Sequence, residues 1–348
     1  MRPGRKVLLS FLALFAGCVI LFAFDLILGS VKIPFGKILS VFEGDSANKS
    51  WYYILWGFRL PKALTALLTG AGLSVAGLQM QTLFRNPLAG PYVLGISSGA
   101  SLGVALYVLA GTFFSFGTIN ILTGMLGSWG LILFAIAGAG LVLVLVFLTS
   151  LKVNDPVSLL IIGIMFGSIT GAVVNVLQYF SDPLNVQSFL IWTFGSLGGV
   201  TWDKLYILVP VVLIGLLIAV GLQKPMNALL LGDNYAQGIG VNVRKIRLWV
   251  ILSTSLLAGS LTAFTGPIAF IGVAVPHLAR SVFKTSDHMI LIPGSALIGS
   301  CLMLICDIVS QLPGYQNTLP INSVSAIFGA PVVIWVIIRS RNVKASFS

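Results

Sequence analysis

Residues Arg59–Ala100 read RLPKALTALLTGAGLSVAGLQMQTLFRNPLAGPYVLGISSGA, and this stretch decides the fold. Its first apolar run, Ala63–Phe84, has about 20 residues, which is enough for a helix to cross a bilayer. The run is rich in glycine, alanine and serine, and such small residues let helix backbones approach closely in lipid. Pro87 and Pro91 then stop helix propagation, because proline lacks an N–H and restricts the residue before it. The stretch therefore predicts a membrane helix, a rigid turn and a second helix.

Small residues also recur at a spacing of four. They are Gly95, Gly99 and Gly103 in the second helix of this stretch, and Gly163, Gly167 and Gly171 further along the chain. Residues four apart lie on one face of a helix. We therefore expect both sets of glycines to be packing faces.

The composition of the whole chain is that of a membrane protein. Of its 348 residues, 57% are hydrophobic and 8% are charged, whereas a soluble domain carries roughly 25% charged residues. The net charge of +11 does not indicate nucleic acid binding, because the basic residues lie in short loops between apolar runs. The three cysteines have neither metal-ligand nor disulfide spacing and are expected to be small buried apolar residues: Cys18, Cys301 and Cys306.

About ten apolar runs are expected to cross the membrane as helices. The first, 7–28, is too long for a signal peptide and is followed by no cleavage site, so we expect it to be retained. The others lie near 61–83, 92–110, 119–150, 157–180, 189–222, 244–264, 268–283, 288–309 and 322–338, and the 189–222 run is expected to be broken, with its true span near 205–222. No linker interrupts the series, so 1–348 is expected to form a single transmembrane domain.

The distribution of basic residues orients this topology. With both termini in the cytoplasm, fourteen of the 20 basic residues lie inside, in agreement with the positive-inside rule. The six that lie outside are Lys32, Lys37, Lys49, Arg59, Lys62 and Lys204. The inverted topology would violate the rule.

Catalytic chemistry has little support in the sequence. The two histidines are His277 and His288, and no second histidine or cysteine lies at ligand spacing from His277, so a structural histidine is favoured over a metal site. The P-loop pattern G-x-x-x-x-G-K-[ST] does not occur, so the chain should not itself bind ATP in a P-loop. We expect no enzyme activity, no catalytic residue and no metal site.

The segment at about 227–243 is the most informative loop. Gly232 and Asp233 break an apolar helix, a short helix with Asp233 as its N-cap can follow, and Gly238 and Gly240 can end it. Replacing Gly240 should disturb a turn that needs positive φ. From these residues alone, a solvated connector and a docking helix for another protein are about equally favoured.

Two other functional classes fit the sequence less well. An ion-coupled secondary transporter should have carboxylates in mid-span and broken helices in matching repeats. Asp25 and Asp307 instead lie at the ends of spans, where a hydrated or paired interface carboxylate is favoured over a functional one. A membrane enzyme should have a cluster of catalytic polar residues, which the sequence lacks.

Four ordered motifs resemble the permease family of iron-chelate and cobalamin ABC importers, and together they cover nearly the whole chain. The first lies within 59–100 and comprises R-L-P-K, G-A-x-L, Q-x-x-x-R-N-P-L-A-x-P and L-G-x-x-x-G-A. The second is L-G-D-N-Y-A followed by G-I-G-V, in 231–241. The third is G-P-I-A-F-I-G with P-H-L-A-R, in 266–280, and the fourth is L-P-I with G-A-P, in 319–331.

The resemblance implies an all-α, polytopic fold of about ten transmembrane helices, as in type II ABC importer permeases. It implies a permease subunit in the bacterial inner membrane that moves an iron–siderophore, haem or cobalamin-type metal chelate into the cytoplasm. Gly198–Trp202 and Lys224–Leu229 look somewhat more like the cobalamin branch, whereas base rate favours iron chelates. The implied partners are a second copy or a paralogue, two ABC ATPase subunits that hold ATP and Mg²⁺, a periplasmic or lipid-anchored binding protein, and membrane lipid. No cofactor in this chain and no nucleic acid is implied.

The resemblance also implies roles for individual residues. The residues that couple the permease to the ATPase are Gly232, Asp233, Ala236, Gly238 and Gly240. The residues of the inner gate are Asn86, Leu88, Pro156, Val157 and Ser158. The residues that line the path are Ser168, Asn175 and Gln178. The binding protein would dock on Arg59 and Lys62, which otherwise serve as interface anchors, and a third arginine of the family pattern is replaced here by Gln311.

Overall fold

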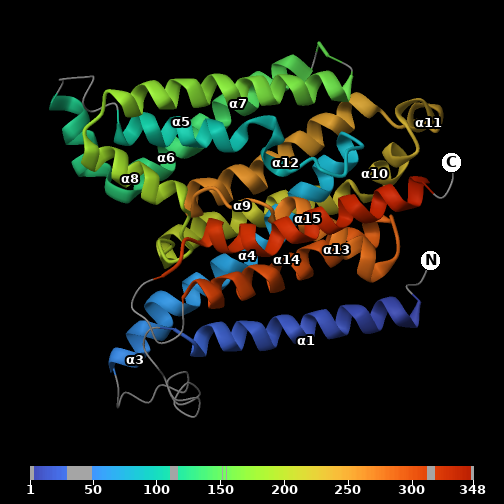
Figure 1. Cartoon of the computed structure of the whole chain (residues 1–348), viewed down its shortest axis with the longest axis horizontal. Coiled ribbons are helices and arrows are strands. Elements are labelled where there is room, and N and C mark those ends of the chain that lie inside the picture. The colour runs from blue at the N-terminus through green and yellow to red at the C-terminus, as the bar shows by residue number, and fades with distance from the viewer. Residues whose placement is uncertain are drawn as a thin grey trace.

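Helix α4 (Leu60–Leu83) lies in the middle of a bundle in which every regular element that the structure describes is helical. The computed structural model describes residues 4–29, 49–109, 117–150, 152–153, 155–311 and 318–345. Most of α4 is buried, whereas α1 (Arg5–Ile27) exposes most of its surface at the edge of the bundle (Figure 1). Both arrangements suit lipid, because a helix satisfies its own backbone groups.

The remaining elements follow α1 and α4 in the same bundle. In chain order they are α3 (Lys49–Ile54), the π-helical turn η2 (Leu55–Arg59), the 3-10 turn η3 (Pro91–Leu94), α5 (Ile96–Val108), α6 (Gly117–Ser150), α7 (Pro156–Tyr179), α8 (Pro183–Thr193), α9 (Trp202–Gly221), α10 (Gln223–Leu230), α11 (Asp233–Gly238), α12 (Val243–Thr265), α13 (Ile271–Phe283), α14 (His288–Ser310) and α15 (Ile321–Ala345).

The number of spans agrees with the prediction. Seven helical segments of the described chain are long and apolar enough to cross a membrane, and three shorter apolar helices accompany them in α5, α13 and α15. These seven long segments and three shorter helices correspond one to one to the ten predicted spans. The prediction of an all-α, polytopic fold is therefore confirmed.

The predicted break in the 189–222 run is present. Helix α8 ends at Thr193 and α9 begins at Trp202, slightly earlier than the expected start near 205. Between them Gly195 has φ +73°, a left-handed conformation that suits glycine, and the Ser196 amide donates to the Thr265 carbonyl at 2.8 Å. Contacts with α12 thus cover this non-helical backbone.

Glycines set the closest helix contacts of α4. A Cβ added to Gly70 would lie 2.1 Å from the Gly299 carbonyl oxygen of α14, and one added to Gly77 would lie 1.7 Å from the Gly272 carbonyl oxygen of α13. The backbones of α4 and these two helices are therefore in contact. The small residues of the opening stretch act as predicted.

The second glycine stripe packs in the same way. Added Cβ atoms on Gly99 and Gly103 would lie 2.5 Å and 1.9 Å from carbonyl oxygens of α6, and one on Gly163 would lie 2.7 Å from the backbone of η3. Gly171 differs, because a Cβ there meets no atom within 4 Å. Its predicted packing role therefore has no partner within the part of this chain that the structure describes.

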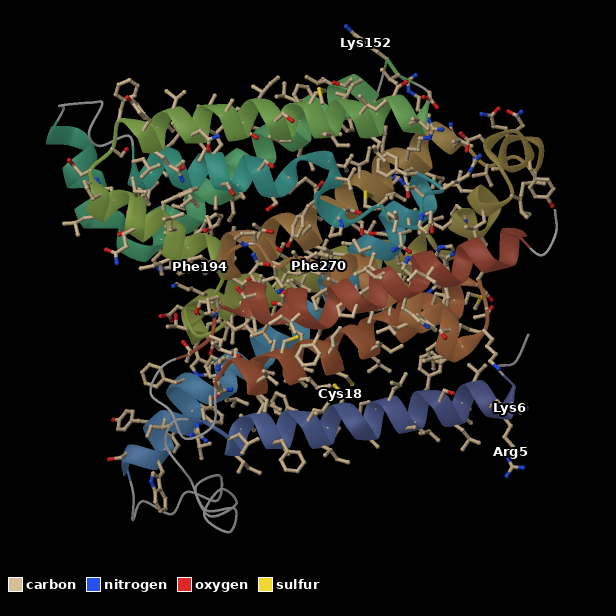
Figure 2. The ribbon with its side chains drawn as sticks, in the orientation of Figure 1. Arg5, Lys6, Cys18, Lys152, Phe194 and Phe270 are labelled. Carbon is tan, nitrogen blue, oxygen red and sulfur yellow. The ribbon has the colours of Figure 1, made fainter. Side chains whose placement is uncertain are left out.

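The two ends of the bundle carry different elements. Figure 1 places both termini, α10 and α11 at one end, and α3 and α8 at the other. The first end carries Arg5 and Lys6, labelled in Figure 2, together with Arg85, and we call it the basic end. The other is called the opposite end. Lys32 and Lys37, which were predicted on the outer side, lie outside the described residues.

Candidate functional site

The turn that follows α4 is held by hydrogen bonds at the basic end. Arg85 has a left-handed backbone (φ +46°), which few non-glycine residues adopt. The Asn86 side-chain oxygen accepts the Leu88 amide at 2.9 Å and closes an Asx turn. His277 Nε2 donates to the Pro87 carbonyl at 2.7 Å. The predicted gate residues Asn86 and Leu88 therefore lie on a fixed turn.

Asp233 joins three segments that are far apart in the sequence. Its carboxylate accepts hydrogen bonds from the guanidinium groups of Arg85, after α4, and Arg247, in α12. Arg85 Nε also donates to the Leu229 carbonyl of α10 at 3.2 Å. Charge-assisted bonds are among the stronger hydrogen bonds in proteins. This group of three charged residues, the Asp233 cluster, therefore ties the turn after α4 to the loop between α10 and α11.

The loop at about 227–243 contains two short helices and two glycine turns. Helix α11 begins at Asp233, but its N-cap is Gly232. The prediction that Asp233 caps this helix is wrong, because two arginines engage its carboxylate. Gly232 and Gly240 have φ +113° and +85°, and α11 ends at Gly238. The predictions that Gly240 needs positive φ and that glycines end the helix are confirmed.

Ala236 lies inside this loop rather than on its surface. The residue is fully buried in a small core with Ala228, Leu229 and Val243. Its methyl group holds α11 against α10 and the start of α12. Any coupling role of Ala236 would therefore act through the shape of the loop and not through contact with another protein.

Asn227 links the same loop to α14 and, through it, to α4. Its amide nitrogen donates to Asp287 Oδ1 at 2.7 Å, and its side-chain oxygen accepts the His288 amide at 2.9 Å. His288 Nε2 in turn lies 2.8 Å from Thr82 Oγ1 of α4. The Met289 amide and Asn227 donate to Asp287 and lower the pKa of that carboxyl below its ordinary value. The loop thus has a second connection to α4.

The predicted gate residues Pro156–Ser158 form the start of α7. Asp155 is the N-cap, and its Oδ2 accepts the hydroxyl and the amide of Ser158, both at 2.8 Å. These two bonds lower the pKa of Asp155 below its ordinary value. Asp155, Arg85 and Asp233 line one open hollow at the basic end. Both predicted gate turns therefore reach the loop that carries α11.

Arg59 belongs to a second polar cluster, at the opposite end. Its Nη1 donates to the carbonyls of Leu26 and Ile27, at 2.7 Å and 2.8 Å, where α1 ends. Carbonyls at a helix C-terminus have no partner within the helix, so this arginine satisfies two of them. The residue is 8% exposed. Its guanidinium therefore tethers α1 to the start of α4.

Lys62 continues this second cluster. Its Nζ lies 3.0 Å from Asp307 Oδ1 of α14, with side chains 19% and 1% exposed. Gln311 Nε2 donates to Asp25 Oδ1 at 2.9 Å and to Asp307 Oδ2 at 3.2 Å. The expectation that Asp307 is paired is confirmed. The docking role of Arg59 and Lys62 stays a prediction, and a test of it must first separate docking from these internal contacts.

Helix α7 carries the residues predicted to line a path. Ser168 and Asn175, seven residues apart, are exposed, and Gln178 is partly exposed. Gly163 and Gly167 pack this helix against η3 and α5. Figure 1 shows α7 along one edge of the bundle. The helix thus leaves a surface on which a second copy could pack, and the path-lining role stays a prediction.

Sequence reasoning missed the chemical roles of three residues at the basic end. It used Arg85 and Arg247 only to orient the chain, and it gave Asn227 no role in the loop. A signal existed for Arg85, because that residue precedes the Asn-Pro turn in a motif that already stood out. For Arg247 the signal would have been its charge opposite to that of Asp233, 14 residues earlier.

The whole chain resembles known transport proteins. The sequence model of the FecCD transport family matches residues 17–339. The vitamin B12 import system permease protein BtuC of Citrobacter koseri is 35% identical in an alignment of 320 positions that covers 90% of this chain and 93% of that protein. The hemin transport system permease protein HmuU of Yersinia pestis is 34% identical in an alignment of 349 positions that covers 99% of each chain.

A solved structure resembles the chain in three dimensions. It is described as an inward-facing conformation of a metal-chelate type ABC transporter. The TM-score is 0.81 at 29% sequence identity, and the alignment covers 94% of this chain and 98% of that one. Similarity in sequence and in fold therefore extends over nearly all of the molecule.

Proposed function

The chain belongs to the FecCD transport family, and on this premise we propose that it is the permease subunit of an ATP-driven importer in the bacterial inner membrane. The structural observation that carries the proposal is the Asp233 cluster, which joins a loop at the basic end to the predicted gate turn after α4. Such a connection is what a membrane protein driven from outside the membrane needs. An ion-coupled mechanism finds no support in the matches.

The cargo we propose is an iron–siderophore, haem or cobalamin-type metal chelate, moved from periplasm to cytoplasm. The names of the relatives support this class, since one is a vitamin B12 import permease and another a hemin transport permease. Their identities of 35% and 34% are too close to each other to favour cobalamin over haem. Cobalamin therefore remains the alternative to an iron chelate.

We propose that two copies, or this chain and a paralogue, enclose the path between them. The exposed surface of α7 with Ser168 and Asn175 supports this arrangement. The basic end faces the cytoplasm, in agreement with the positive-inside rule. ATP and Mg²⁺ belong to two separate ATPase subunits, and a binding protein delivers the chelate at the opposite end.

The part of this chain in energy coupling is mechanical. The loop with α10 and α11 docks on the ATPase at the basic end, and its displacement reaches the gate turn through Asp233 and Arg85. Arg247 gives the same carboxylate an attachment on α12. Because these bonds join separate helices, a shift of the loop moves the gate turn without a change in the helices themselves.

Gly240→Ala is expected to lower co-purification of the ATPase subunits, whereas Gly221→Ala, at the end of α9 and outside the predicted coupling residues, is not. A Cβ at either position meets no atom within 4 Å, but only Gly240 has positive φ, +85°. Alanine in that conformation costs on the order of 1–3 kcal/mol, so the loop should leave its docking shape. Equal amounts of ATPase bound to the two variants in a pull-down from detergent would remove the turn at Gly240 from the docking element.

Single cysteines at Ser168 and Asn175 are expected to cross-link between two copies of the chain, or to react with a water-soluble thiol reagent from one side of the membrane. Both side chains are exposed on α7, where a second copy would enclose the path. The background lacks Cys18, Cys301 and Cys306, and a cysteine at the lipid-exposed position Leu12 of α1 serves as control. Inertness of both α7 positions in a transporter that still imports would place the path elsewhere.

The proposed function is tested by reconstitution of the permease with its ATPase and binding protein in vesicles. Ferric siderophore, haem and cobalamin are supplied separately, and ATP-dependent accumulation inside the vesicles is measured. One of the three should accumulate well above a control without ATP. Accumulation driven by an ion gradient in the absence of ATPase would contradict the proposal.

A further inference from the structure

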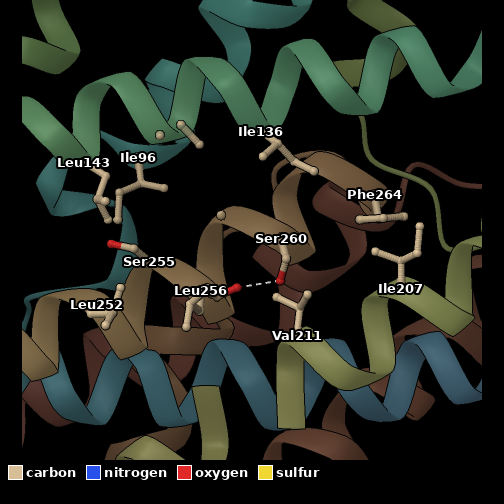
Figure 3. Close-up of a pocket in the computed structure, with 13 residues that line it drawn as sticks. Ile96, Ile136, Leu143, Ile207, Val211, Leu252, Ser255, Leu256, Ser260 and Phe264 are labelled. Atoms are coloured by element: carbon tan, nitrogen blue, oxygen red, sulfur yellow. Dashed lines mark hydrogen bonds between the residues drawn. The ribbon is translucent and has the colours of Figure 1, made fainter. Parts of the chain in front are cut away.

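An elongated apolar pocket lies between α6, α9 and α12 (Figure 3), and no residue of the two polar clusters lines it. Its volume is about 280 Å³. For comparison, an apolar cavity of about 150 Å³ stays dry and binds benzene. The pocket is therefore large enough for a segment of hydrocarbon and too apolar to hold ordered water.

The pocket runs in the same direction as the spans. On α12 its wall extends from Leu252 to Phe264, which is about 18 Å of helix at a rise of 1.5 Å per residue. One leaflet supplies about half of a hydrocarbon core that is about 30 Å thick. A straight chain in this pocket would therefore lie parallel to the acyl chains of one leaflet, over a similar length.

The pocket opens toward the outside of the bundle. Ile136 of α6, Ile207 of α9 and Leu252 of α12 line it and are 42%, 48% and 39% exposed. Exposed apolar side chains within membrane spans face hydrocarbon, so an acyl chain is what reaches this opening from the bilayer. A polar chelate would lose its hydration in such a pocket without gaining hydrogen bonds.

Two serines are the polar residues of the wall. The Ser260 hydroxyl donates to the Leu256 carbonyl at 2.5 Å, as the dashed line in Figure 3 shows. The buried Ser255 hydroxyl, on the part of the wall near Ile96 and Leu143, has no hydrogen-bond partner among the described residues. A hydrocarbon occupant needs no polar contact from either serine.

A cation lies beyond the pocket toward the opposite end. Lys204 precedes Ile207 and Val211 of the pocket wall by three and seven residues, so all three share one face of α9. Its ammonium donates to the Gly199 carbonyl at 2.8 Å, and an ammonium has three donors in total. Lysine at the end of a span lies at headgroup level. The site therefore pairs an apolar slot with a cation at the depth of a lipid phosphate.

We propose that this pocket binds one acyl chain of a phospholipid from the surrounding bilayer, with the anionic headgroup at Lys204. The proposal does not depend on which chelate the protein carries. The chain would fill the space that the side chains of α6, α9 and α12 leave open, and would thereby become part of the packed structure.

The test uses the full chain in vesicles of phosphatidylethanolamine and phosphatidylglycerol that contain phosphatidylglycerol with a photoreactive acyl chain. After illumination, labelled peptides are identified by mass spectrometry. Gly140 lines the pocket and an added Cβ there meets no atom within 4 Å, so Gly140→Leu should fill the pocket without a clash. We expect labelling of α6 and α12 to fall about tenfold, because the methylenes excluded from the pocket lose their burial.

Gly17→Leu is the matched control, since Gly17 is also free of neighbours within 4 Å but lies on α1. It should leave labelling unchanged. Lys204→Gln should reduce the preference for phosphatidylglycerol over phosphatidylethanolamine about threefold, the range of an exposed ion pair. Val211→Phe fills the pocket from α9 and replaces Gly140→Leu if that variant does not elute as a monodisperse protein.

Two results would overturn the proposal. If neither pocket-filling variant changes the labelling, the lipid contacts of α6 and α12 are those of any exposed helix. If Ser255→Ala lowers labelling as strongly as Gly140→Leu, the occupant places a polar group deep in the pocket and is not an acyl chain. Unchanged labelling in Ser255→Ala supports the assignment.

Discussion

Asp233→Asn is expected to lower chelate uptake roughly thirtyfold while the ATPase subunits remain bound. The carboxylate faces Arg85 and Arg247 within the chain, so its loss should cut the link to the gate turn rather than the docking surface. Hydrogen bonds to charged groups contribute about 1.5–3 kcal/mol to stability, and the bond to Arg85 contributes less because that side chain is exposed to solvent. A loss of about 2 kcal/mol of interaction between the loop and the gate turn corresponds to the roughly thirtyfold fall in uptake. Uptake and ATP hydrolysis are measured in the same vesicles.

Two variants make this result specific. Asp233→Glu keeps the charge and should recover part of the uptake. Asp203→Asn removes an exposed carboxylate in the first turn of α9, at the opposite end, and should import normally. Uptake by Asp233→Asn within a factor of about two of the wild type would show that the cluster does not transmit movement.

Lys62→Met is expected to lower the free energy of unfolding by about 3 kcal/mol, because it leaves the Asp307 carboxylate without its cation. That carboxylate is 1% exposed, so little water screens its charge. Unfolding is followed in detergent by circular dichroism with increasing denaturant. The double variant Lys62→Met/Asp307→Leu removes both charges and should recover most of the stability, since an apolar pair often replaces a buried ion pair at little cost. Similar stability of wild type and single variant would mean that the pair is hydrated.

The same double variant also gives a clean test of docking. Charge reversal at Arg59 would disturb the end of α1, where its guanidinium binds two carbonyls, so a loss of docking would be ambiguous. The double variant lacks the Lys62 charge but should fold. If Lys62 steers the binding protein, the association rate and its dependence on salt should both fall. An unchanged rate would leave Lys62 a structural residue only.

The spans could be predicted because lipid restricts the chain so strongly. In hydrocarbon every backbone N–H and C=O group needs a hydrogen-bond partner within the protein. An apolar run of sufficient length in such a chain therefore forms a helix. Turns were also predictable where proline and glycine act locally, as at Pro87 and Gly240. The 92–110 run was expected to be one helix, but it begins as the 3-10 turn η3, and Gly95 with φ +75° separates that turn from α5.

The side-chain partners could not be predicted, because they depend on which helices lie side by side. Asp233 looked like a local cap, yet its carboxylate binds Arg85, 148 residues earlier. Arg59 looked like a residue exposed at the membrane interface, yet it is buried against the end of α1, about 30 residues earlier. In both residues a long-range contact outweighs the local preference.

The contact between Gly70 and Gly299 limits how sequences of this kind can diverge. Alanine at Gly70 would place its Cβ 2.1 Å from the Gly299 carbonyl oxygen, and alanine at Gly299 would place one 2.2 Å from the Gly70 carbonyl oxygen. The obstacle on each side is the partner's main chain, which no mutation can shorten. Protein cores usually change by pairs of mutations in which one residue grows while its neighbour shrinks. Such compensation is not possible at these two positions. Lineages can vary the lipid-facing surface freely, but only a displacement of whole helices would release this pair.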